Sequence, residues 1–547
     1  MLRSLRGVRQ AEALGHFNHR RDFGGIPMIA LHSLAYRTRR IDRRQFLGAA
    51  ATAAALLPGR RLWADVSGSS AVPSEVAAVS GDGKPVALSA AEVKEFRAGL
   101  KGKLLLARDA GYDEARRVWN GSIDRHPALI ARCESREDIV RAVQFASAHS
   151  LLTAVKGGGH SLSGHSTCEG GLMIDLSPMR QITLDREKRV ARAQPGVLLA
   201  ALDGECQAAG LVTPLGTAAD TGIAGLTLGG GQGRLMRKLG LSCDNVRSFE
   251  LVTADGKVRK VTASENPDLY WALRGGGGNF GAVSGFEYGL HPLAHPVLAG
   301  GRMYPFSQAR SVIKGLADMA ANAPDELYLS GAVVNSSGEG HLAKGTYVAV
   351  EFVYSDDPKA GERFLPTLDK LGKPLNDTIA AKPYVVAQNG PTGAAPPALP
   401  PGLGVYVRSG FTQTISDKLI DELIHAFEQG PPWLDEFGFG PIGGEVARIK
   451  ADATAYWNRE AQYELILIGA WVDHAQDEHN IASMRDIWKV FEPFTQGYYV
   501  NTEPSAAESR LKATYGGNYS RLVQLKNQYD PKNLFRLNAN IRPTAHA

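Results

Sequence analysis

Apolar and polar positions follow two different patterns along this chain, and the change falls near His291. In the first part, short apolar runs of strand type alternate with stretches whose apolar residues recur every three or four positions, which is typical of helices. The strands predicted here are 128–132, 151–155, 171–176 and 189–194, and the helices are 90–110, 135–149 and 197–209. The order predicts β-α-β units.

One helix start is specified in detail. Ser135 precedes Glu137 and Asp138 in a capping arrangement, and Ile139 and Val143 continue as an apolar stripe. The helix is therefore expected to begin after Ser135.

Beyond His291, longer strand-like runs alternate with helical stretches, which predicts an α+β domain with an antiparallel sheet. The predicted strands are 328–334, 346–353, 405–411 and 463–472, and the helices are 306–321, 359–371 and 417–427. Residues 390–404, rich in Pro, Gly and Ala, indicate a surface loop. Near the end, Asp530 and Pro531 stop a helix at 519–528, and 535–541 is expected to be extended.

Three glycine clusters interrupt the first part, at 156–164, 221–233 and 274–281. Consecutive glycines supply no side chain for burial, and they suit places where backbone approaches a ligand or takes positive φ. Alone, the first cluster could be a surface turn with a solvated His160. In the second cluster, apolar residues between the glycines favour extended backbone over a strand-turn-helix dinucleotide fingerprint. Together the clusters predict a long, flat, phosphorylated ligand cradled by backbone amides.

Composition and charge narrow the class of protein. The 547 residues are 44% hydrophobic and 21% charged, which is ordinary for a globular protein, and the length predicts two or three domains. The net charge is +5, but residues 1–64 hold twelve Arg and three acids, a net of +9, so the remainder is 5 − 9 = −4. We therefore expect no nucleic-acid binding from the body.

The basic leader, 1–64, resembles a twin-arginine signal. Arg43 and Arg44 precede an uncharged run at 46–58, about thirteen residues, which is too short to span a bilayer of roughly 30 Å. We expect export of a folded, cofactor-loaded protein to the periplasm or medium, and no stable membrane span. Met28 is an alternative start, and a buried amphipathic helix is the alternative structure.

Four cysteines, at 133, 168, 206 and 243, show no metal-ligand spacing, and no metal site is expected. Each is expected to be a small buried hydrophobe, although an exported protein could pair two of them.

Several motifs in this order resemble the berberine-bridge-enzyme-like FAD-linked oxidoreductases, which have the vanillyl-alcohol-oxidase (PCMH-type) fold. The match extends from about Trp119 to Pro543, and its motifs are 156–161, 222–233, 236–245, 515–519 and 530–535. The resemblance implies an α+β protein with a two-part FAD-binding domain and a substrate domain whose antiparallel sheet is covered by helices. The implied divisions are the signal region 1–64, a leading segment 65–122, the FAD domain 123–295, the substrate domain 296–500 and a C-terminal segment 501–547 that returns to the FAD domain.

In that family, the histidine at the position of His160 bonds to the 8α carbon of the flavin. The glycines allow close approach of the ring, and a neutral imidazole is a competent nucleophile. Many relatives have a second link through a cysteine where this chain has Ala218, so a single link is expected. The resemblance implies FAD contacts at Lys156, Gly157, Gly158, Gly159, Ser161, Leu162, Gly164, Thr221, Gly222, Gly225, Leu226, Gly230, Gly231, Gly233, Gly281, Val283, Asn538 and Asn540.

The catalytic end departs from the family pattern, because Thr502 replaces the second tyrosine of Tyr-x-Asn-Tyr. Tyr499 is the first candidate for the base, followed by Tyr384, Tyr463 and Glu464. Tyr463 and Glu464 are consecutive, so a regular strand would point only one of them at the flavin.

The predicted reaction is a two-electron oxidation of a C–H bond next to a hydroxyl or amine of a small molecule, such as a sugar, an aromatic alcohol or an alkaloid-like amine. Dioxygen is the expected acceptor. The alternatives are a dehydrogenase that reduces a quinone or a protein, and a non-enzymatic flavin-binding protein.

Overall fold

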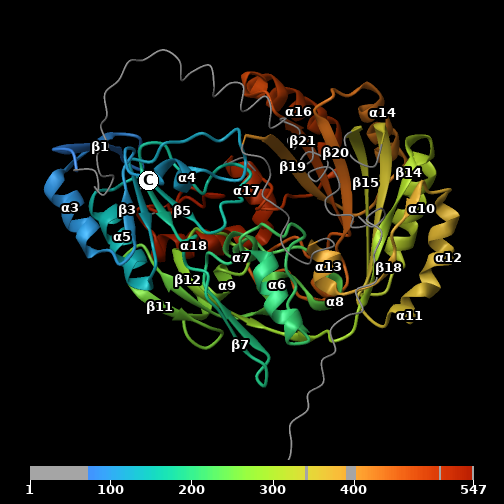
Figure 1. Cartoon of the computed structure of the whole chain (residues 1–547), viewed down its shortest axis with the longest axis horizontal. Helices are drawn as coiled ribbons and strands as arrows, with labels where there is room; N and C mark the ends of the chain where they lie inside the picture. Colours follow the sequence, from blue (N-terminus) through green and yellow to red (C-terminus); the bar gives the residue numbers. More distant parts are fainter. Residues whose placement is uncertain (1–71, 339–342, 390–401, 504–506, 545–547) are drawn as a thin grey trace, which may run out of the picture.

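The structure, a computed structural model, describes residues 72–338, 343–389, 402–503 and 507–544 (Figure 1). The predicted signal region, 1–64, lies outside the described residues. So do residues 390–401 of the predicted surface loop.

The first sheet has four strands in the order β3-β4-β6-β5, with β4 and β5 parallel to the central β6 and β3 antiparallel to β4. These strands are β3 (Lys103–Leu105), β4 (Leu129–Arg132), β5 (Thr153–Lys156) and β6 (Leu172–Asp175). The hairpin of β1 (Glu75–Val79) and β2 (Pro85–Ser89) precedes them. The helices of this region are α3 (Ala90–Gly99), α4 (Tyr112–Arg116) and α5 (Arg136–Ala148). The predicted β-α-β unit is β4-α5-β5.

The predicted start of α5 is confirmed. The Ser135 side chain accepts a hydrogen bond from the Asp138 N–H, and the Asp138 carboxylate accepts one from the Ser135 N–H. The prediction of one helix over 90–110 is wrong, because α3 ends at Gly99 and β3 follows. Two tertiary contacts override the helical pattern: the Asp138 carboxylate accepts from the N–H groups of Lys101 and Gly102, and β3 pairs with β4.

A second, antiparallel sheet has the order β11-β10-β12-β8-β7. Its strands are β7 (Ile182–Asp185), β8 (Val190–Ala193), β10 (Val246–Val252), β11 (Val258–Val261) and β12 (Ala282–Gly289). A separate two-stranded pair joins β9 (Leu211–Val212) to β13 (His291–Pro292). The helices between these strands are α6 (Leu199–Ala208), α7 (Ile223–Leu228), α8 (Met236–Leu239) and α9 (Pro267–Ala272).

The end of the chain returns to this second sheet. Helices α17 (Glu508–Tyr515) and α18 (Tyr519–Tyr529) contribute Leu511, Tyr515 and Leu522 to the hydrophobic core that contains Phe249 and Phe286 of the sheet. The predicted extended stretch 535–541 forms no strand, but Ala539 and Ile541 are buried in the same core.

The second glycine cluster is not extended throughout as predicted, because six of its residues form α7. Ile223, Ala224, Thr227 and Leu228 are buried, and their spacing places them on one face of a short helix. Gly225 lies on the opposite, uncovered face. The apolar residues between the glycines therefore pack inward while the backbone stays bare on the other side.

The second half is one large antiparallel sheet with the order β17-β14-β16-β15-β20-β21-β19, and β18 pairs with β14. Its strands are β14 (Val297–Pro305), β15 (Leu327–Ser337), β16 (Lys344–Tyr354), β17 (Asn376–Asp377), β18 (Ala380–Lys382), β19 (Gly404–Thr412), β20 (Leu434–Pro441) and β21 (Tyr463–Trp471). Helices α10 (Ala309–Ala321), α14 (Asp417–Gln429) and α16 (Asp477–Phe491) share a hydrophobic core with it. The predicted antiparallel sheet covered by helices is confirmed.

The four strands predicted in this half are present, but β14 and β20 were not predicted. Both strands contain two glycines and end in proline, which weakens the strand pattern. The predicted helix 359–371 is broken into α11 (Pro358–Gly361), α12 (Leu365–Leu368) and 3₁₀ turns. Pro366 lacks the N–H that a continuous helix needs. The remaining short helices are α13 (Tyr384–Asn389) and α15 (Glu445–Arg448).

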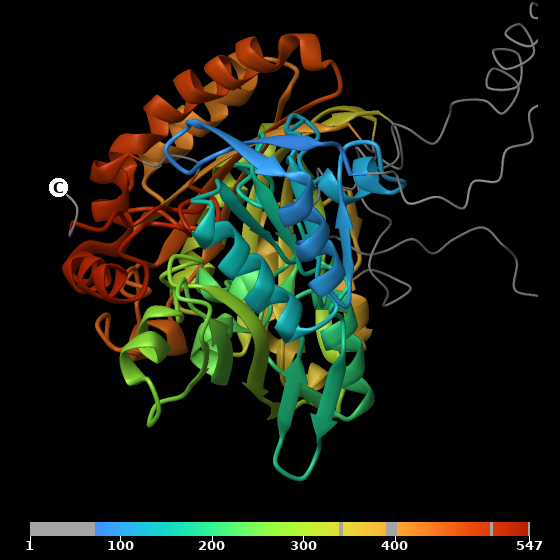
Figure 2. The same ribbon diagram turned by 90° about the vertical axis from the view of Figure 1, so that its left-hand side faces the viewer.

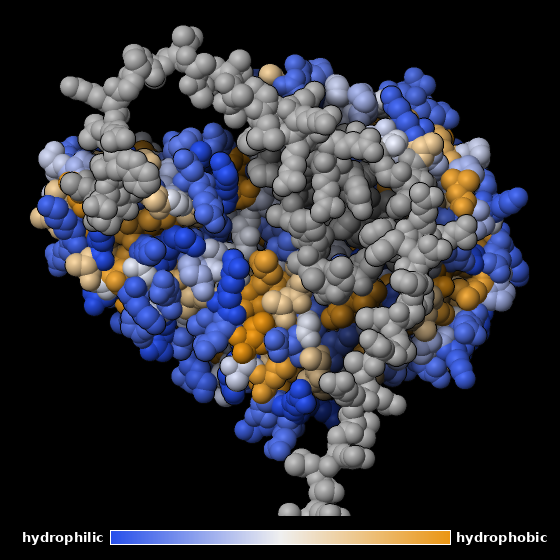
Figure 3. Space-filling model, in the orientation of Figure 1, coloured by the Kyte–Doolittle hydropathy of each residue, from blue (hydrophilic) through white to orange (hydrophobic). Residues whose placement is uncertain are grey.

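Figure 2 shows α16 along the outside of the molecule and the hairpin of β7 and β8 projecting from the body. The coloured part of the face in Figure 3 is mostly hydrophilic, and apolar residues gather near α6 and toward both edges of the view. Among the described residues, no helix is both long enough and apolar enough to cross a membrane.

Candidate active site

A large cavity lies between the glycine clusters of the first half and one face of the large sheet. The glycine clusters supply one wall, β15, β16, β20 and β21 supply the other, and residues 499–502 and 537–539 close the remaining sides. Most of the predicted FAD contacts line it, namely Gly157, Gly158, Gly159, His160, Ser161, Leu162, Thr221, Gly222, Gly225, Leu226, Gly233, Gly281, Val283 and Asn538.

The first two glycine clusters touch through their backbones. A Cβ at Gly158 would lie 2.5 Å from the backbone of Gly222, and a Cβ at Gly222 would lie 2.5 Å from the backbone of Gly158. Gly159 has φ +74°, a conformation that glycine adopts readily. Glycine is thus required here because the two segments approach each other closely. The same glycines also form the wall of the cavity.

Five predicted contacts do not line the cavity: Lys156, Gly164, Gly230, Gly231 and Asn540. Lys156 points away, and its Nζ donates to the carbonyls of Ala115 and Arg117 at 2.7 and 2.9 Å. Gly164 packs against Ile123. These residues shape the loops that carry the cavity wall.

The cavity wall fits a flavin nucleotide. Gly225 exposes bare backbone, since a Cβ there would meet nothing within 4 Å, so the helix α7 leaves room for a flat ligand. The buried Oδ1 atom of Asn538 lacks a hydrogen-bond partner among the described residues. Backbone amides, an imidazole and an amide oxygen suit the phosphates and ring edge of FAD.

His160 is held between two residues that the sequence analysis did not assign to the site. The Trp119 ring stacks on the imidazole with ring centroids 4.3 Å apart, and His160 Nε2 lies 3.5 Å from Asp220 Oδ1. The Trp119 indole N–H donates to Asp220 Oδ2 at 3.2 Å. The glycine pattern placed 221–233 at the ligand, but nothing in it indicated that the preceding Asp220 faces a histidine sixty residues earlier.

The opposite wall follows from the two-residue repeat of the strands. In β21, Tyr463, Leu465 and Leu467 pack toward the helices, whereas Glu464, Ile466 and Ile468 line the cavity. The same alternation brings Tyr328, Ser330, Glu351 and Glu436 to the cavity from the neighbouring strands.

One of these carboxylates is already paired. The Arg234 guanidinium donates to Glu351 Oε1 at 2.6 Å, and the Arg234 side chain is 1% exposed. Glu351 is thus neutralised inside the wall, and it serves to orient Arg234 beside the second glycine cluster.

Glu464 is differently placed. Its Oε1 is buried without a hydrogen-bond partner among the described residues, and burial raises the pKa of its carboxyl to about 7, against the hydrogen bond from Ser409. The Ser409 hydroxyl also hydrogen-bonds Thr502, which stands where the second tyrosine was expected. A carboxyl with a pKa near neutrality, facing a ligand cavity, can act as a general base.

Comparisons with known proteins agree with this geometry. Residues 127–262 match the FAD binding domain family, and residues 498–542 match the family described as berberine and berberine like. An FAD-linked oxidoreductase from Dictyostelium discoideum is 30% identical over 82% of this chain and 97% of its own length. The chain belongs to the berberine-bridge-enzyme-like FAD-linked oxidoreductases.

Two further similarities support this assignment. (R)-6-Hydroxynicotine oxidase from Paenarthrobacter nicotinovorans is 30% identical over 81% of this chain and 97% of its own length. The crystal structure of 6-hydroxy-D-nicotine oxidase from Arthrobacter nicotinovorans superposes with a TM-score of 0.71 and 27% identity, over 81% of this chain and 98% of that one. This berberine-bridge-enzyme-like protein is an FAD-dependent oxidoreductase.

Two of the four catalytic candidates lie away from the cavity. The Tyr463 hydroxyl donates to the Ala317 carbonyl on α10, on the helix side of the sheet. Tyr384 is buried against Gln388 and does not line the cavity. Both positions contradict direct contact with a substrate. For Tyr463 this agrees with the alternation along β21, which turns Tyr463 and Glu464 to opposite faces of the sheet.

Tyr499 does line the cavity, but its hydroxyl is committed. It accepts hydrogen bonds from the Asn501 amide at 2.8 Å and from the N–H groups of Gly231 and Gln232 at 3.1 and 3.4 Å. Burial raises its pKa above the usual range, with the charge of Glu464 adding to the effect. The phenol thereby holds the backbone of the second glycine cluster.

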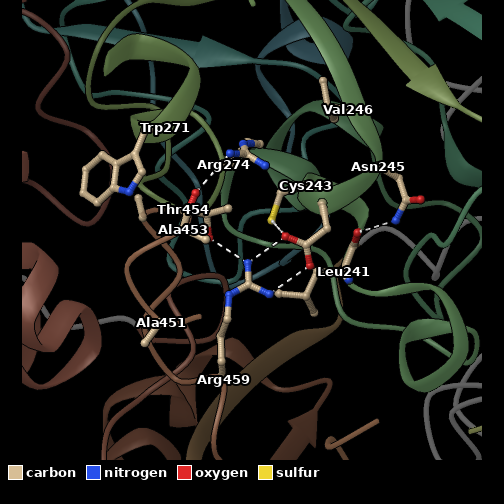
Figure 4. A network of polar contacts seen from close by, with 12 residues as sticks. Leu241, Cys243, Asn245, Val246, Trp271, Arg274, Ala451, Ala453, Thr454 and Arg459 are labelled. Carbon is tan, nitrogen blue, oxygen red and sulfur yellow. Dashed lines mark hydrogen bonds and ion pairs between the residues drawn. The ribbon is translucent and has the colours of Figure 1, made fainter. Parts of the chain in front are cut away.

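In this family member, a buried ion pair fixes the segment that supports Tyr499. Arg459, with a fully buried side chain, donates to both carboxylate oxygens of Asp244 at 2.7 and 2.9 Å and to the Thr454 hydroxyl at 2.7 Å (Figure 4). The segment 454–459 then places Tyr456, whose hydroxyl accepts a hydrogen bond from Gln232 and whose ring lies 6.4 Å from that of Tyr499.

The cysteines play no part in the cavity. All four are free and buried, so none of them forms the disulfide that export would have permitted. Burial raises the pKa of the Cys168 thiol to about 12, and Cys168 does not line the cavity. Ala218 does line it, and its methyl side chain cannot bond to a flavin.

Proposed function

We propose that this protein oxidises a C–H bond next to a hydroxyl or amine of a small molecule, with FAD linked through His160 and dioxygen as the final acceptor. The observation that carries the proposal is Glu464, an acid with a pKa of about 7 whose buried oxygen faces the cavity on the wall opposite His160. A base and a flavin site on facing walls suit coupled removal of a proton and a hydride.

The residues of the chain divide the work of binding and proton transfer. A bound FAD would supply the acceptor for the hydride that leaves the substrate carbon. The backbone of Gly157, Gly158 and Gly225 holds the flavin nucleotide, and Glu464 takes the proton from the substrate hydroxyl or amine. Ser409 and Thr502 orient the Glu464 carboxylate, and the large sheet excludes water from the reacting groups.

A single covalent anchor at His160 is part of the proposal. The imidazole lines the cavity, and the glycines before it remove the side chains that would obstruct its approach. Ala218 makes a second anchor impossible at the position where relatives have cysteine.

The substrate class stays broad within this proposal. The similarity to (R)-6-hydroxynicotine oxidase supports a cyclic amine, and the uncharged parts of the cavity wall, such as Ile466, Ile468 and Val407, suit an apolar ring. Sugars and aromatic alcohols remain in the test panel because Ser330 and Tyr328 add hydroxyls to the same wall.

Two measurements test the proposal. Acid precipitation of the purified protein should leave the flavin in the pellet, with peptide mapping placing it on His160; free flavin in the supernatant would exclude covalent attachment. Anaerobic mixing with sugars, aromatic alcohols and cyclic amines should bleach the flavin absorbance, and admission of air should restore it with one hydrogen peroxide per turnover. A flavin that stays reduced in air would identify a dehydrogenase, and no bleaching by any substrate would contradict the enzymatic proposal.

A further inference from the structure

The side chain of His160 is fixed from two directions. Trp119 covers the face of the imidazole at 4.3 Å between ring centroids, and Asp220 Oδ1 lies 3.5 Å from His160 Nε2 at the edge. The three residues come from the loop before β4, the loop after β5 and the loop before α7. Their meeting is thus a product of the tertiary fold.

The Asp220 carboxylate is itself oriented. Its second oxygen, Oδ2, accepts the Trp119 indole N–H at 3.2 Å, which leaves Oδ1 directed at the histidine. Burial opposes ionisation of Asp220, but its contacts with His160, with its own backbone and with the Trp119 indole outweigh burial and lower the carboxyl pKa. Asp220 is therefore an ionised acceptor at neutral pH.

This arrangement selects one tautomer of the imidazole. A carboxylate beside Nε2 favours the proton on Nε2, so the Nδ1 lone pair is available for bonding. The imidazole ring becomes positive as Nδ1 forms a bond. The negative Asp220 carboxylate beside Nε2 lies where it can stabilise this charge.

We infer that Asp220, held by Trp119, is the general base that accepts the Nε2 proton when His160 becomes attached to the flavin. The inference rests on the proposed covalent link at His160 and adds to it the group that drives the attachment. Thereafter Asp220 is a positioning residue, which keeps the linked imidazole in one orientation.

The step balances with dioxygen as oxidant. The N–C bond forms between His160 Nδ1 and the 8α carbon, and one C–H bond at that carbon breaks. The electron pair of the C–H bond reduces the flavin ring. Two protons are released, one from the methyl group and one from Nε2 through Asp220. Dioxygen then takes the two electrons and two protons and leaves as hydrogen peroxide.

The test follows covalent attachment directly. Full-length apoprotein from riboflavin-starved cells is mixed with FAD in air, and the acid-stable flavin in the pellet is measured over time. Asp220→Asn keeps the size of the side chain but removes the base, and it should slow attachment by about 100-fold, at the lower end of the effect of a general base. Asp220→Glu should restore much of the rate. Reversible binding of FAD, measured by flavin fluorescence, should change little in either variant.

A second variant separates the role of the carboxylate from folding. Trp119→Phe keeps an aromatic ring on His160 but loses the indole N–H, and it should slow attachment less than Asp220→Asn does. Glu187→Gln, at an exposed carboxyl in the turn between β7 and β8, is the matched control and should attach flavin at the wild-type rate. Wild-type rates in Asp220→Asn would overturn the inference alone, whereas wild-type protein without acid-stable flavin would overturn the proposed link and the inference with it.

Discussion

Glu464 illustrates how one residue acquires a role from its surroundings. Its neighbours on the strand, Tyr463 and Leu465, face the helix layer, so only this position of the three reaches the cavity. Burial holds the carboxyl near pKa 7, so at neutral pH protonated and ionised forms coexist. The same group would be a weak base in water, where its pKa is about 4.3.

Because the carboxylate is the active form of a base and the pKa is raised, flavin reduction by substrate should accelerate as pH rises from about 6 to about 8. Glu464→Gln should lower the reduction rate by about 100-fold or more and abolish this rise. Stopped-flow absorbance under anaerobic conditions measures both effects.

Tyr463→Phe is the matched control, since it removes a hydroxyl from the same strand on the opposite face. Its reduction rate should stay within about twofold of wild type, because only a hydrogen bond to the Ala317 carbonyl is lost. A Glu464→Gln variant that keeps the wild-type pH profile would assign the base to another group.

At the scale of elements, the cavity depends on irregular segments that are anchored by buried polar pairs. The segment 454–459 carries Tyr456 to the second glycine cluster, and the Arg459–Asp244 pair ties it to the residues after that cluster. A backbone hydrogen bond from Tyr456 N–H to the Arg274 carbonyl links it to the third cluster as well. The second and third glycine clusters are thus held by contacts that are distant in sequence.

Arg459→Met leaves the Asp244 charge unpaired in a buried place, and it should lower the free energy of unfolding by about 3 kcal/mol. Urea unfolding followed by tryptophan fluorescence measures the loss. Lys489→Met, which breaks an exposed pair with Asp486, should have no measurable effect. Equal stability of the two variants would show that the Arg459 pair does not hold the segment.

At the scale of the whole molecule, the cavity joins two halves that fold around different sheets. Its walls come from the loops of the first half, from the large sheet and from the C-terminal segment. A ligand in this cavity contacts both halves and the C-terminal segment, so its binding should stabilise the assembled fold.

Reversible binding of FAD should therefore raise the stability of the folded protein. Added FAD should not change the melting temperature of wild-type protein that already carries linked flavin. In His160→Ala the melting temperature should rise with FAD concentration, corresponding to about 2.7 kcal/mol at a hundred times the dissociation constant. Thermal unfolding at several FAD concentrations, with adenosine as control ligand, measures the dependence. A wild-type melting temperature that rises with FAD would indicate reversible binding.

Much of the local structure was readable in the sequence because it depends on neighbouring residues. The start of α5 is set by Ser135 and Asp138, three residues apart, and the strands 328–334 and 463–472 are indicated by mainly apolar runs. The three glycine clusters predicted a flat ligand because glycine is rarely kept in such runs for packing. The family motifs likewise identified the FAD site.

Only the tertiary structure decided which of these residues act together. Strand register and the helix layer place Glu464 in the cavity and Tyr463 on the opposite face of the sheet. Lys156 points away from the cavity and donates to the carbonyls of Ala115 and Arg117. Asp220 came to face His160 across sixty residues of sequence. Such contacts join segments that lie far apart along the chain, and no periodic pattern in the sequence indicates them. The sequence by itself therefore determined the ligand and the fold class, and the packing of loops and sheet determined the chemistry around it.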